Sequence, residues 1–271
     1  MKQKKITLGI IQENPIVGDI EGNLKLAIES IEALYTENGS HDIYLFTEMF
    51  ITGYPPEDLI LREDLLHSAY AAIKELGRLK PESYIVIGYP KKEGDCIYNC
   101  AGVLHNNSII LEYKKQELPN YEVFDEKRYF KPGNSAGIFE VNKTKIALTV
   151  CEDIWHNHAI DQANKNGADL ILNINASPFH LQKISERKNL ISKHASKYAI
   201  PIVYANQVGG QDELVFDGTS MVMDSKGEQV LQLEKFKEDR RTIVLLSENE
   251  SDLFASEQDI IPDEDEIADV Y

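Results

Sequence analysis

The stretch Lys145-Ile-Ala-Leu-Thr-Val-Cys151-Glu152-Asp153 decides the fold and the chemistry of this chain. Its aliphatic and β-branched residues predict a buried strand, which ends at a cysteine followed at once by two acids. A thiol at a strand end, on the edge of a sheet, is placed to attack a bound carbonyl group. Free cysteines are also common as small apolar core residues, so Cys151 needs matching groups elsewhere before it can be interpreted as a nucleophile.

Outward from this stretch, apolar strand-like segments alternate with amphipathic helices. Strands are predicted at 6–12, 41–48, 84–89, 97–105, 108–113, 137–141, 145–150, 170–175, 200–207, 219–224, 228–233 and 242–246. Helices are predicted at 23–35, 61–79, 157–166 and 180–198, and a long functional loop at 118–133. Strands and helices alternate early and late, while the middle and the end are hairpin-like. This order predicts an α/β domain with a mixed sheet, or two packed sheets, covered by helices.

The composition is that of a globular enzyme, with 271 residues, 42% hydrophobic and 27% charged. A net charge of −17 and the lack of a concentrated basic stretch argue against a nucleic-acid partner. No apolar run approaches the roughly 18 residues of a membrane helix, and the amino terminus leads almost directly into a strand. We therefore expect no membrane association and a cytoplasmic location. Three cysteines do not indicate a disulfide framework, and Cys96 and Cys100 are expected to be buried structural thiols.

A cysteine that attacks an amide needs a base, an acid for the leaving nitrogen and positive charge for the oxyanion. His156, His158 and His180 are candidate bases, but a zinc site is disfavoured because no second ligand pair has suitable spacing. Glu48 ends an apolar strand, where partial desolvation would raise its pKa. Lys115 also follows a strand, where it could lower a thiol pKa, stabilise an oxyanion and protonate ammonia. Taken singly, a glutamate at a strand end is ordinarily a cap or an ion-pair partner, and such a lysine is ordinarily a surface residue.

One Glu, one Lys and one Cys in this order resemble the nitrilase, or carbon–nitrogen hydrolase, superfamily. Four stretches are similar to the glutaminase domains of glutamine-dependent NAD synthetases: 46–62 (FTEMFITGYPPEDLILR), 115–130 (KQELPNYEVFDEKRYF), 151–155 (CEDIW) and 175–180 (NASPFH). The resemblance covers essentially the whole chain. It implies a four-layer α-β-β-α sandwich that hydrolyses L-glutamine.

The resemblance also implies roles for individual residues. Glu48 is expected to be the general base, Lys115 the cationic acid and oxyanion stabiliser, and Cys151 the nucleophile. Glu126 matches a second acidic residue of the family that supports these three. The residues that match the glutamine pocket are Tyr121, Glu152, Trp155, Ser177 and Lys183.

The charges of these residues suit a glutamine pocket, because Glu152 can bind the substrate α-ammonium and Lys183 its α-carboxylate. Trp155 either walls the aliphatic part of the substrate or is ordinary core packing. Two positions depart from the family pattern and make the local loop geometry uncertain. Gln182 precedes Lys183 where the family often has glycine, and Glu122 follows Tyr121 where it often has glycine.

The resemblance divides the chain into an amidohydrolase domain at 1–260 and an acidic linker at 261–271 toward an ATP-dependent synthetase domain. That domain's Ser-Gly-Gly-x-Asp-Ser loop is absent here. The hydrolytic half is expected to need no metal or organic cofactor. ATP and Mg²⁺ would serve the synthetase domain, which would transfer the ammonia to nicotinic acid adenine dinucleotide. By analogy the chain forms a homo-oligomer.

Two other functions remain open. The chain could be a stand-alone amidase for another small amide, which a pocket without the Lys183 clamp would favour. It could instead be a catalytically silent assembly module, against which the intact Glu48–Lys115–Cys151 set argues.

Overall fold

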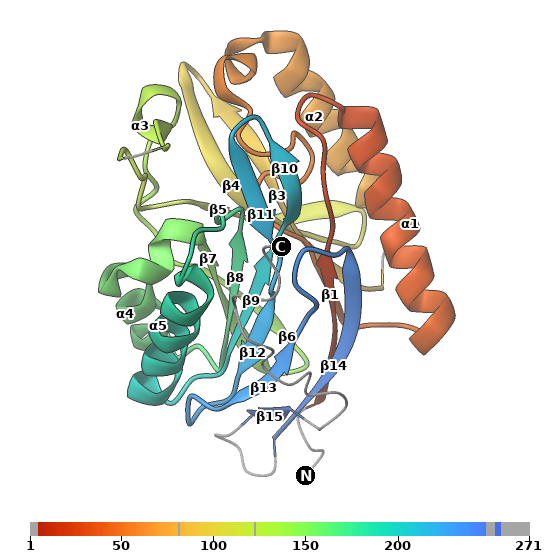
Figure 1. Ribbon diagram of the computed structural model, residues 1–271. Helices are drawn as coiled ribbons and strands as arrows, with labels where there is room; N and C mark the ends of the chain where they lie inside the picture. The colour runs from red at the N-terminus through yellow and green to blue at the C-terminus, as the bar shows by residue number, and fades with distance from the viewer. Residues whose placement is uncertain (1–4, 81, 122, 248–252, 256–271) are drawn as a thin grey trace.

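The structure, a computed structural model, describes residues 5–80, 82–121, 123–247 and 253–255. Two β-sheets lie face to face between two helical layers, which confirms the expected four-layer α-β-β-α sandwich (Figure 1). The first sheet has the order β15 (Leu253–Ala255), β14 (Asp239–Ser247), β1 (Lys5–Gln12), β2 (Ile43–Leu45), β3 (Tyr84–Glu93), β4 (Cys96–His105) and β5 (Ser108–Lys114). The second has the order β13 (Gln229–Gln232), β12 (Met221–Met223), β9 (Ile202–Asn206), β8 (Leu170–Asn175), β7 (Thr144–Val150) and β6 (Gly137–Val141).

Helices cover the outer face of each sheet. The first sheet is covered by α1 (Ile20–Asn38) and α2 (Glu63–Leu76), and the second by α4 (Asn157–Lys165) and α5 (Lys183–Tyr198) (Figure 1). Gly9 of β1 allows α1 to approach closely, because a Cβ at this position would lie 2.7 Å from Leu34 Cδ1. The connections contain two 3-10 helices, η1 (Glu57–Leu61) and η2 (Cys151–Trp155), the short helix α3 (Glu126–Tyr129) and the hairpin β10 (Val208–Gln211) and β11 (Leu214–Asp217).

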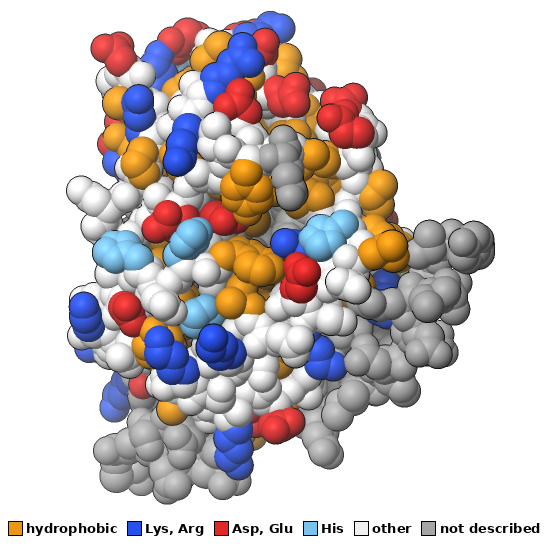
Figure 2. All heavy atoms as spheres, turned by 60° about the vertical axis from the view of Figure 1, so that its left-hand side comes forward, with side chains coloured by type: hydrophobic (Ala, Val, Ile, Leu, Met, Phe, Trp, Pro, Cys, Tyr) orange, Lys and Arg blue, Asp and Glu red, His pale blue; other side chains and the backbone are white. Residues whose placement is uncertain are grey.

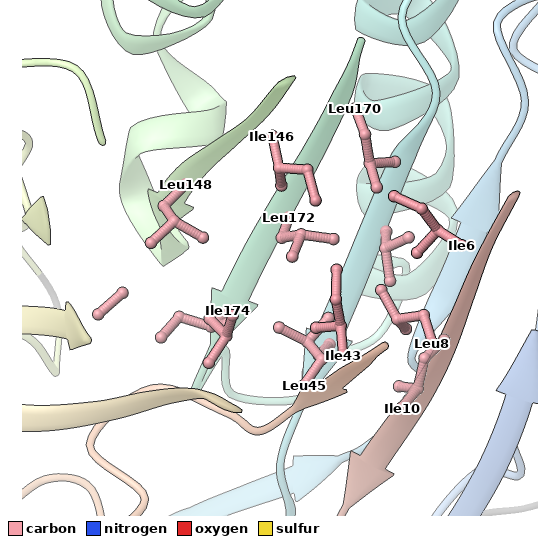
Figure 3. Close-up of a cluster of buried hydrophobic side chains, with 14 of the residues drawn as sticks. Ile6, Leu8, Ile10, Ile43, Leu45, Ile146, Leu148, Leu170, Leu172 and Ile174 are labelled. Carbon is pink, nitrogen blue, oxygen red and sulfur yellow. The ribbon is translucent and has the colours of Figure 1, made fainter. Parts of the chain in front are cut away.

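The main core lies between the two sheets. Ile6, Leu8 and Ile10 alternate along β1 and share this core with Leu170 and Leu172 of β8, all fully buried (Figure 3). The residues between them face the helices, so the strands are buried on both sides and form near-continuous apolar runs. Each such side chain stabilises the fold by roughly 1.5–3 kcal/mol.

The strand directions bring several loops to one edge of the sandwich. β1, β2 and β3 are parallel, and β5 runs in the same direction because β3–β4 and β4–β5 are both antiparallel. In the second sheet β7, β8 and β9 are parallel. The carboxyl ends of β2, β5, β7 and β8 are followed by Glu48, Lys115, Cys151 and Ala176 respectively. A loop after any of these strands can therefore meet the others.

Several sequence-based boundaries are wrong. The strand predicted at 41–48 ends at Leu45, because the chain turns there and Met49 has a φ of 48°. The helix predicted at 61–79 is shorter, because the extended Arg62 separates Leu61, the last residue of η1, from α2, which ends at Leu76. The helix expected from His180 begins at Lys183. The predicted loop 118–133 contains α3, and β10, β11 and β15 were not predicted.

All three cysteines are free; Cys100 is buried as predicted, whereas Cys96 is half-buried. Within the described ranges, no helix has both the length and the apolar character needed to cross a membrane. The predicted linker at 261–271 and Glu122 lie outside the described residues.

Candidate active site

The thiol of Cys151 lies at a sharp turn between β7 and η2. Cys151 has a φ of 45°, in the left-handed region that costs a non-glycine residue roughly 1–3 kcal/mol. Its side chain belongs to the buried core and is 6% exposed. Burial raises the pKa of the Cys151 thiol well above its ordinary value, Glu48 raises it further, and Lys115 lowers it. The thiol is therefore protonated at rest and needs a base before it can attack a carbonyl.

Glu48 lies in the turn that follows β2, not at the end of the strand as predicted. This turn packs against Gly88 of β3, whose N–H donates to the Thr47 carbonyl at 3.1 Å. A Cβ on Gly88 would lie 2.3 Å from the Met49 backbone nitrogen. Only a glycine therefore leaves room for the backbone that carries Glu48, whose side chain is fully buried.

Lys115 lies between two buried carboxylates. Its Nζ donates to Glu48 Oε1 and to Glu126 Oε1, both at 2.8 Å, and the Lys115 and Glu48 side chains are 0% exposed. Burial by itself would lower the pKa of Lys115, but the charges of Glu126 and Glu48 outweigh it and hold this pKa well above its ordinary value. Burial raises the pKa of Glu126 to about 7, while Lys115 opposes this rise. Lys115 is thus a permanent buried cation.

Three partners of these carboxylates were not anticipated from the sequence. Asn99 of β4 donates its Nδ2 to Glu48 Oε1 at 2.7 Å, and the Ala176 N–H donates to Glu48 Oε2 at 2.8 Å. The Tyr54 hydroxyl donates to Glu126 Oε1 at 2.9 Å. Asn99 could have been noticed in the sequence as an amide side chain within a buried strand. A backbone N–H donor such as that of Ala176 has no feature in the sequence that marks it.

A pocket of about 220 Å³ opens at Cys151. Its walls include all five residues predicted to bind the substrate, namely Tyr121, Glu152, Trp155, Ser177 and Lys183. Val123, Phe124, Pro178, Phe179, His180, Glu213, Leu214 and Val215 complete them. Figure 2 brings this side of the molecule forward and shows hydrophobic side chains gathered at its middle, with histidine, acidic and basic side chains around them.

Opposite charges lie on the pocket wall. Glu152 accepts a hydrogen bond from the Tyr121 hydroxyl at 2.9 Å, and its carboxylate lies 3.3 Å from His156 Nε2. Lys183 Nζ lies 4.0 Å from the centre of the Trp155 ring. Trp155 lines this pocket and also packs against the core cluster beneath α4 and α5.

The candidate histidine bases have other contacts. His156 contacts Glu152, His158 Nε2 lies 3.0 Å from Gln162 Nε2, and the His180 ring contacts the Leu181 carbonyl. A larger hollow of about 590 Å³ lies elsewhere, between α1 and α2, and is lined by residues such as Asp19 and Leu24. The convergence of buried charges therefore identifies the candidate site, not the size of the cavity.

Three comparisons place these features among known proteins. The profile of the carbon–nitrogen hydrolase family matches residues 7–249. The glutamine-dependent NAD(+) synthetase of Thermotoga maritima is 40% identical over 254 residues, which cover 92% of this chain and 43% of that protein. The structure of glutamine-dependent NAD+ synthetase from Acinetobacter baumannii, in complex with ADP, is similar with a TM-score of 0.87 and 33% identity over 96% of this chain and 49% of the other.

An amidase of the nitrilase superfamily from Nesterenkonia has the same fold, with a TM-score of 0.79 and 22% identity over 89% of this chain and 90% of the amidase. The chain spans about half the length of the NAD synthetases that it matches.

Proposed function

Because the chain belongs to the carbon–nitrogen hydrolase family, we propose that it hydrolyses the side-chain amide of L-glutamine to glutamate and ammonia. The observation that carries this proposal is the pocket at Cys151, which has the Glu152 carboxylate and the Lys183 ammonium on its wall. These charges complement the ammonium and carboxylate of an α-amino acid. The volume of about 220 Å³ is below the range of about 300–1,000 Å³ that drug-sized ligands occupy, as a small substrate requires.

In the first half of the reaction, Glu48 takes the proton of the Cys151 thiol and the sulfur bonds to the amide carbon. The carbonyl oxygen becomes an oxyanion, stabilised by the Lys115 ammonium and a backbone N–H at the start of η2. The carbon–nitrogen bond then breaks, and the departing nitrogen receives a proton and leaves as ammonia. The raised pKa of Lys115 favours its electrostatic role, so protonated Glu48 is the better donor.

In the second half, water attacks the glutamyl thioester while Glu48 accepts a proton from it. The carbon–sulfur bond breaks, Glu48 returns its proton to the departing sulfur, and glutamate leaves, which restores the Cys151 thiol. Glu126 shares the Lys115 ammonium with Glu48 and so keeps the cation in place throughout. This scheme uses protein side chains, one backbone N–H and water, and needs no metal or organic cofactor.

The ammonia would be consumed by an ATP- and Mg²⁺-dependent domain that amidates nicotinic acid adenine dinucleotide to NAD. This part of the proposal rests on the similarity to NAD synthetases, which extend well beyond the region matched here. A homo-oligomer is proposed on the same analogy.

The test is intact-mass spectrometry after incubation with 6-diazo-5-oxo-L-norleucine, a glutamine analogue that alkylates an activated cysteine. We expect one adduct, prevented by L-glutamine, absent in Cys151→Ala and retained in the control Cys96→Ala. In Lys183→Met, protection by glutamine should weaken about 10- to 100-fold, the equivalent of roughly 1.5–3 kcal/mol for a charged hydrogen bond. Iodoacetamide, which has no carboxylate, should still label Cys151 in that variant.

Two outcomes would overturn the proposal. A folded protein whose Cys151 reacts with iodoacetamide but not with the analogue would act on a different small amide. A Cys151 that reacts with neither reagent would favour a silent assembly module.

A further inference from the structure

The carboxylate of Asp153 lies in the interior and accepts four hydrogen bonds. Its Oδ1 accepts from the backbone N–H groups of Gln116 at 3.0 Å and Glu117 at 2.8 Å. Its Oδ2 accepts from the Tyr113 hydroxyl at 2.8 Å and the Val150 N–H at 2.9 Å. The Asp153 side chain is fully buried, so its lone pairs are satisfied by the protein.

The four donors flank the two reactive groups on the chain. Gln116 and Glu117 directly follow Lys115, Tyr113 precedes it by two residues, and Val150 directly precedes Cys151. Three of the four lie 36 to 40 residues from Asp153 in sequence. A carboxylate that only capped the turn at Cys151 would need the Val150 N–H alone. The Asp153 carboxylate instead joins the segment after β5 to the turn after β7.

The Lys115 segment is itself anchored on its other side. The Lys115 N–H donates to the Asn99 carbonyl, and its carbonyl accepts from the Gly133 N–H, both at 2.8 Å. The Lys115 backbone is thus held by β4 and the loop at 133. Asp153 then determines where the Cys151 turn lies relative to it.

We propose that Asp153 is a positioning residue that sets the separation between the Cys151 thiol and the Lys115 ammonium, a role that rests on the proposed function of these two groups. Asp153 does not act on the substrate. Its carboxylate is needed because an amide of the same shape would turn two acceptor positions into donors facing N–H or O–H groups. In Asp153→Asn one of the two segments must therefore move away.

The pH dependence of Cys151 alkylation by iodoacetamide distinguishes positioning from a simple charge effect. Burial raises the pKa of Asp153 to about 6, so the carboxylate is charged at neutral pH. Removing a nearby negative charge would by itself lower the pKa of the thiol. Moving Lys115 away would raise it, because this ammonium lowers the pKa of Cys151. We therefore expect the thiol pKa in Asp153→Asn to rise.

Turnover of glutamine should fall on the order of 100-fold in Asp153→Asn, as expected for a displaced reacting group, with KM unchanged. Tyr113→Phe removes one donor and keeps the carboxylate, so we expect a smaller rise of the thiol pKa and a smaller loss of turnover. If Asp153→Asn does not fold, Tyr113→Phe tests the positioning role in its place. The matched control is Asp169→Asn, at the other end of β7, where Oδ2 accepts from the Lys145 N–H at 2.8 Å. It should leave the thiol pKa and turnover unchanged.

A thiol pKa that falls or stays constant in folded Asp153→Asn, or an unchanged pKa and turnover in Tyr113→Phe, would overturn the proposal. The alkylation measurement needs no glutamine. It therefore tests the positioning role even if the natural substrate is another amide, which the diazo-analogue experiment would reveal separately.

Discussion

Replacing Lys115 by methionine tests how much its ammonium stabilises the two buried carboxyl groups that flank it. Lys115→Met keeps much of the side-chain volume but removes the positive charge 2.8 Å from both Glu48 and Glu126. Removing one partner of a buried ion pair costs about 3–5 kcal/mol, because the remaining charge is left uncompensated. This is a large part of the roughly 5–15 kcal/mol that stabilises a typical domain.

The loss of folding stability in Lys115→Met should depend on pH. The pKa of Glu126 is already raised to about 7 from 4.5, and it should rise further without Lys115. A carboxyl group whose pKa is raised on folding contributes stability below its unfolded pKa, and this contribution is lost as the pH rises through its folded pKa. The variant should therefore be most destabilised near pH 8 and less so near pH 5.5, where Glu126 can remain protonated.

Urea denaturation, followed by the fluorescence of Trp155, the single tryptophan, measures the free energy of unfolding at each pH. Lys114→Met is the matched control, because Lys114 is the preceding residue and forms a surface pair with Glu93 that is worth about 0–1 kcal/mol. This control should show little change at either pH and should keep its activity, whereas Lys115→Met should lose activity. The reasoning would be refuted if the two variants were equally stable near pH 8. It would also be refuted if the destabilisation of Lys115→Met were no smaller near pH 5.5 than near pH 8.

Two backbone positions give further predictions. Gly88→Ala places a Cβ 2.3 Å from the Met49 nitrogen, so it should destabilise the fold by about 1–3 kcal/mol and lower turnover by about 10- to 100-fold. In the control Gly210→Ala, the atom nearest to the new Cβ is 3.6 Å away, so the melting temperature should barely change. Gln182→Gly should raise the free energy of unfolding by roughly 0.5–1 kcal/mol, because Gln182 has a φ of 74°; a lower melting temperature would contradict this strain.

Much of the fold could be predicted because its signals are local. The run Leu170–Asn175 is mostly aliphatic, and its predicted bounds are those of β8. Boundaries failed where one residue took an unexpected conformation. Gln182 is an example, since a left-handed glutamine has no pattern that marks it, although the departure from glycine there indicated the position at which to look. The hairpin β10–β11 was missed because its strands are only four residues long.

Sequence alone determined which residues to consider, because the order of Glu48, Lys115 and Cys151 and the motifs around them are linear features of the chain. The pocket residues also followed from these motifs, and all five line one cavity with Cys151. The number of residues between them, however, does not predict their distance in space. Glu48 and Lys115 are 67 residues apart and meet at 2.8 Å.

Tertiary structure alone decided the partners that give these residues their chemistry. The Ala176 N–H reaches Glu48 because parallel strands from two sheets end at the same edge of the sandwich, and Asn99 reaches it because the antiparallel strand β4 begins at that edge. The four donors around Asp153 converge for the same reason. Hydrogen bonds and buried charges act through space over a few ångströms, so strand order and sheet packing, which sequence encodes only through the whole fold, determine which groups meet.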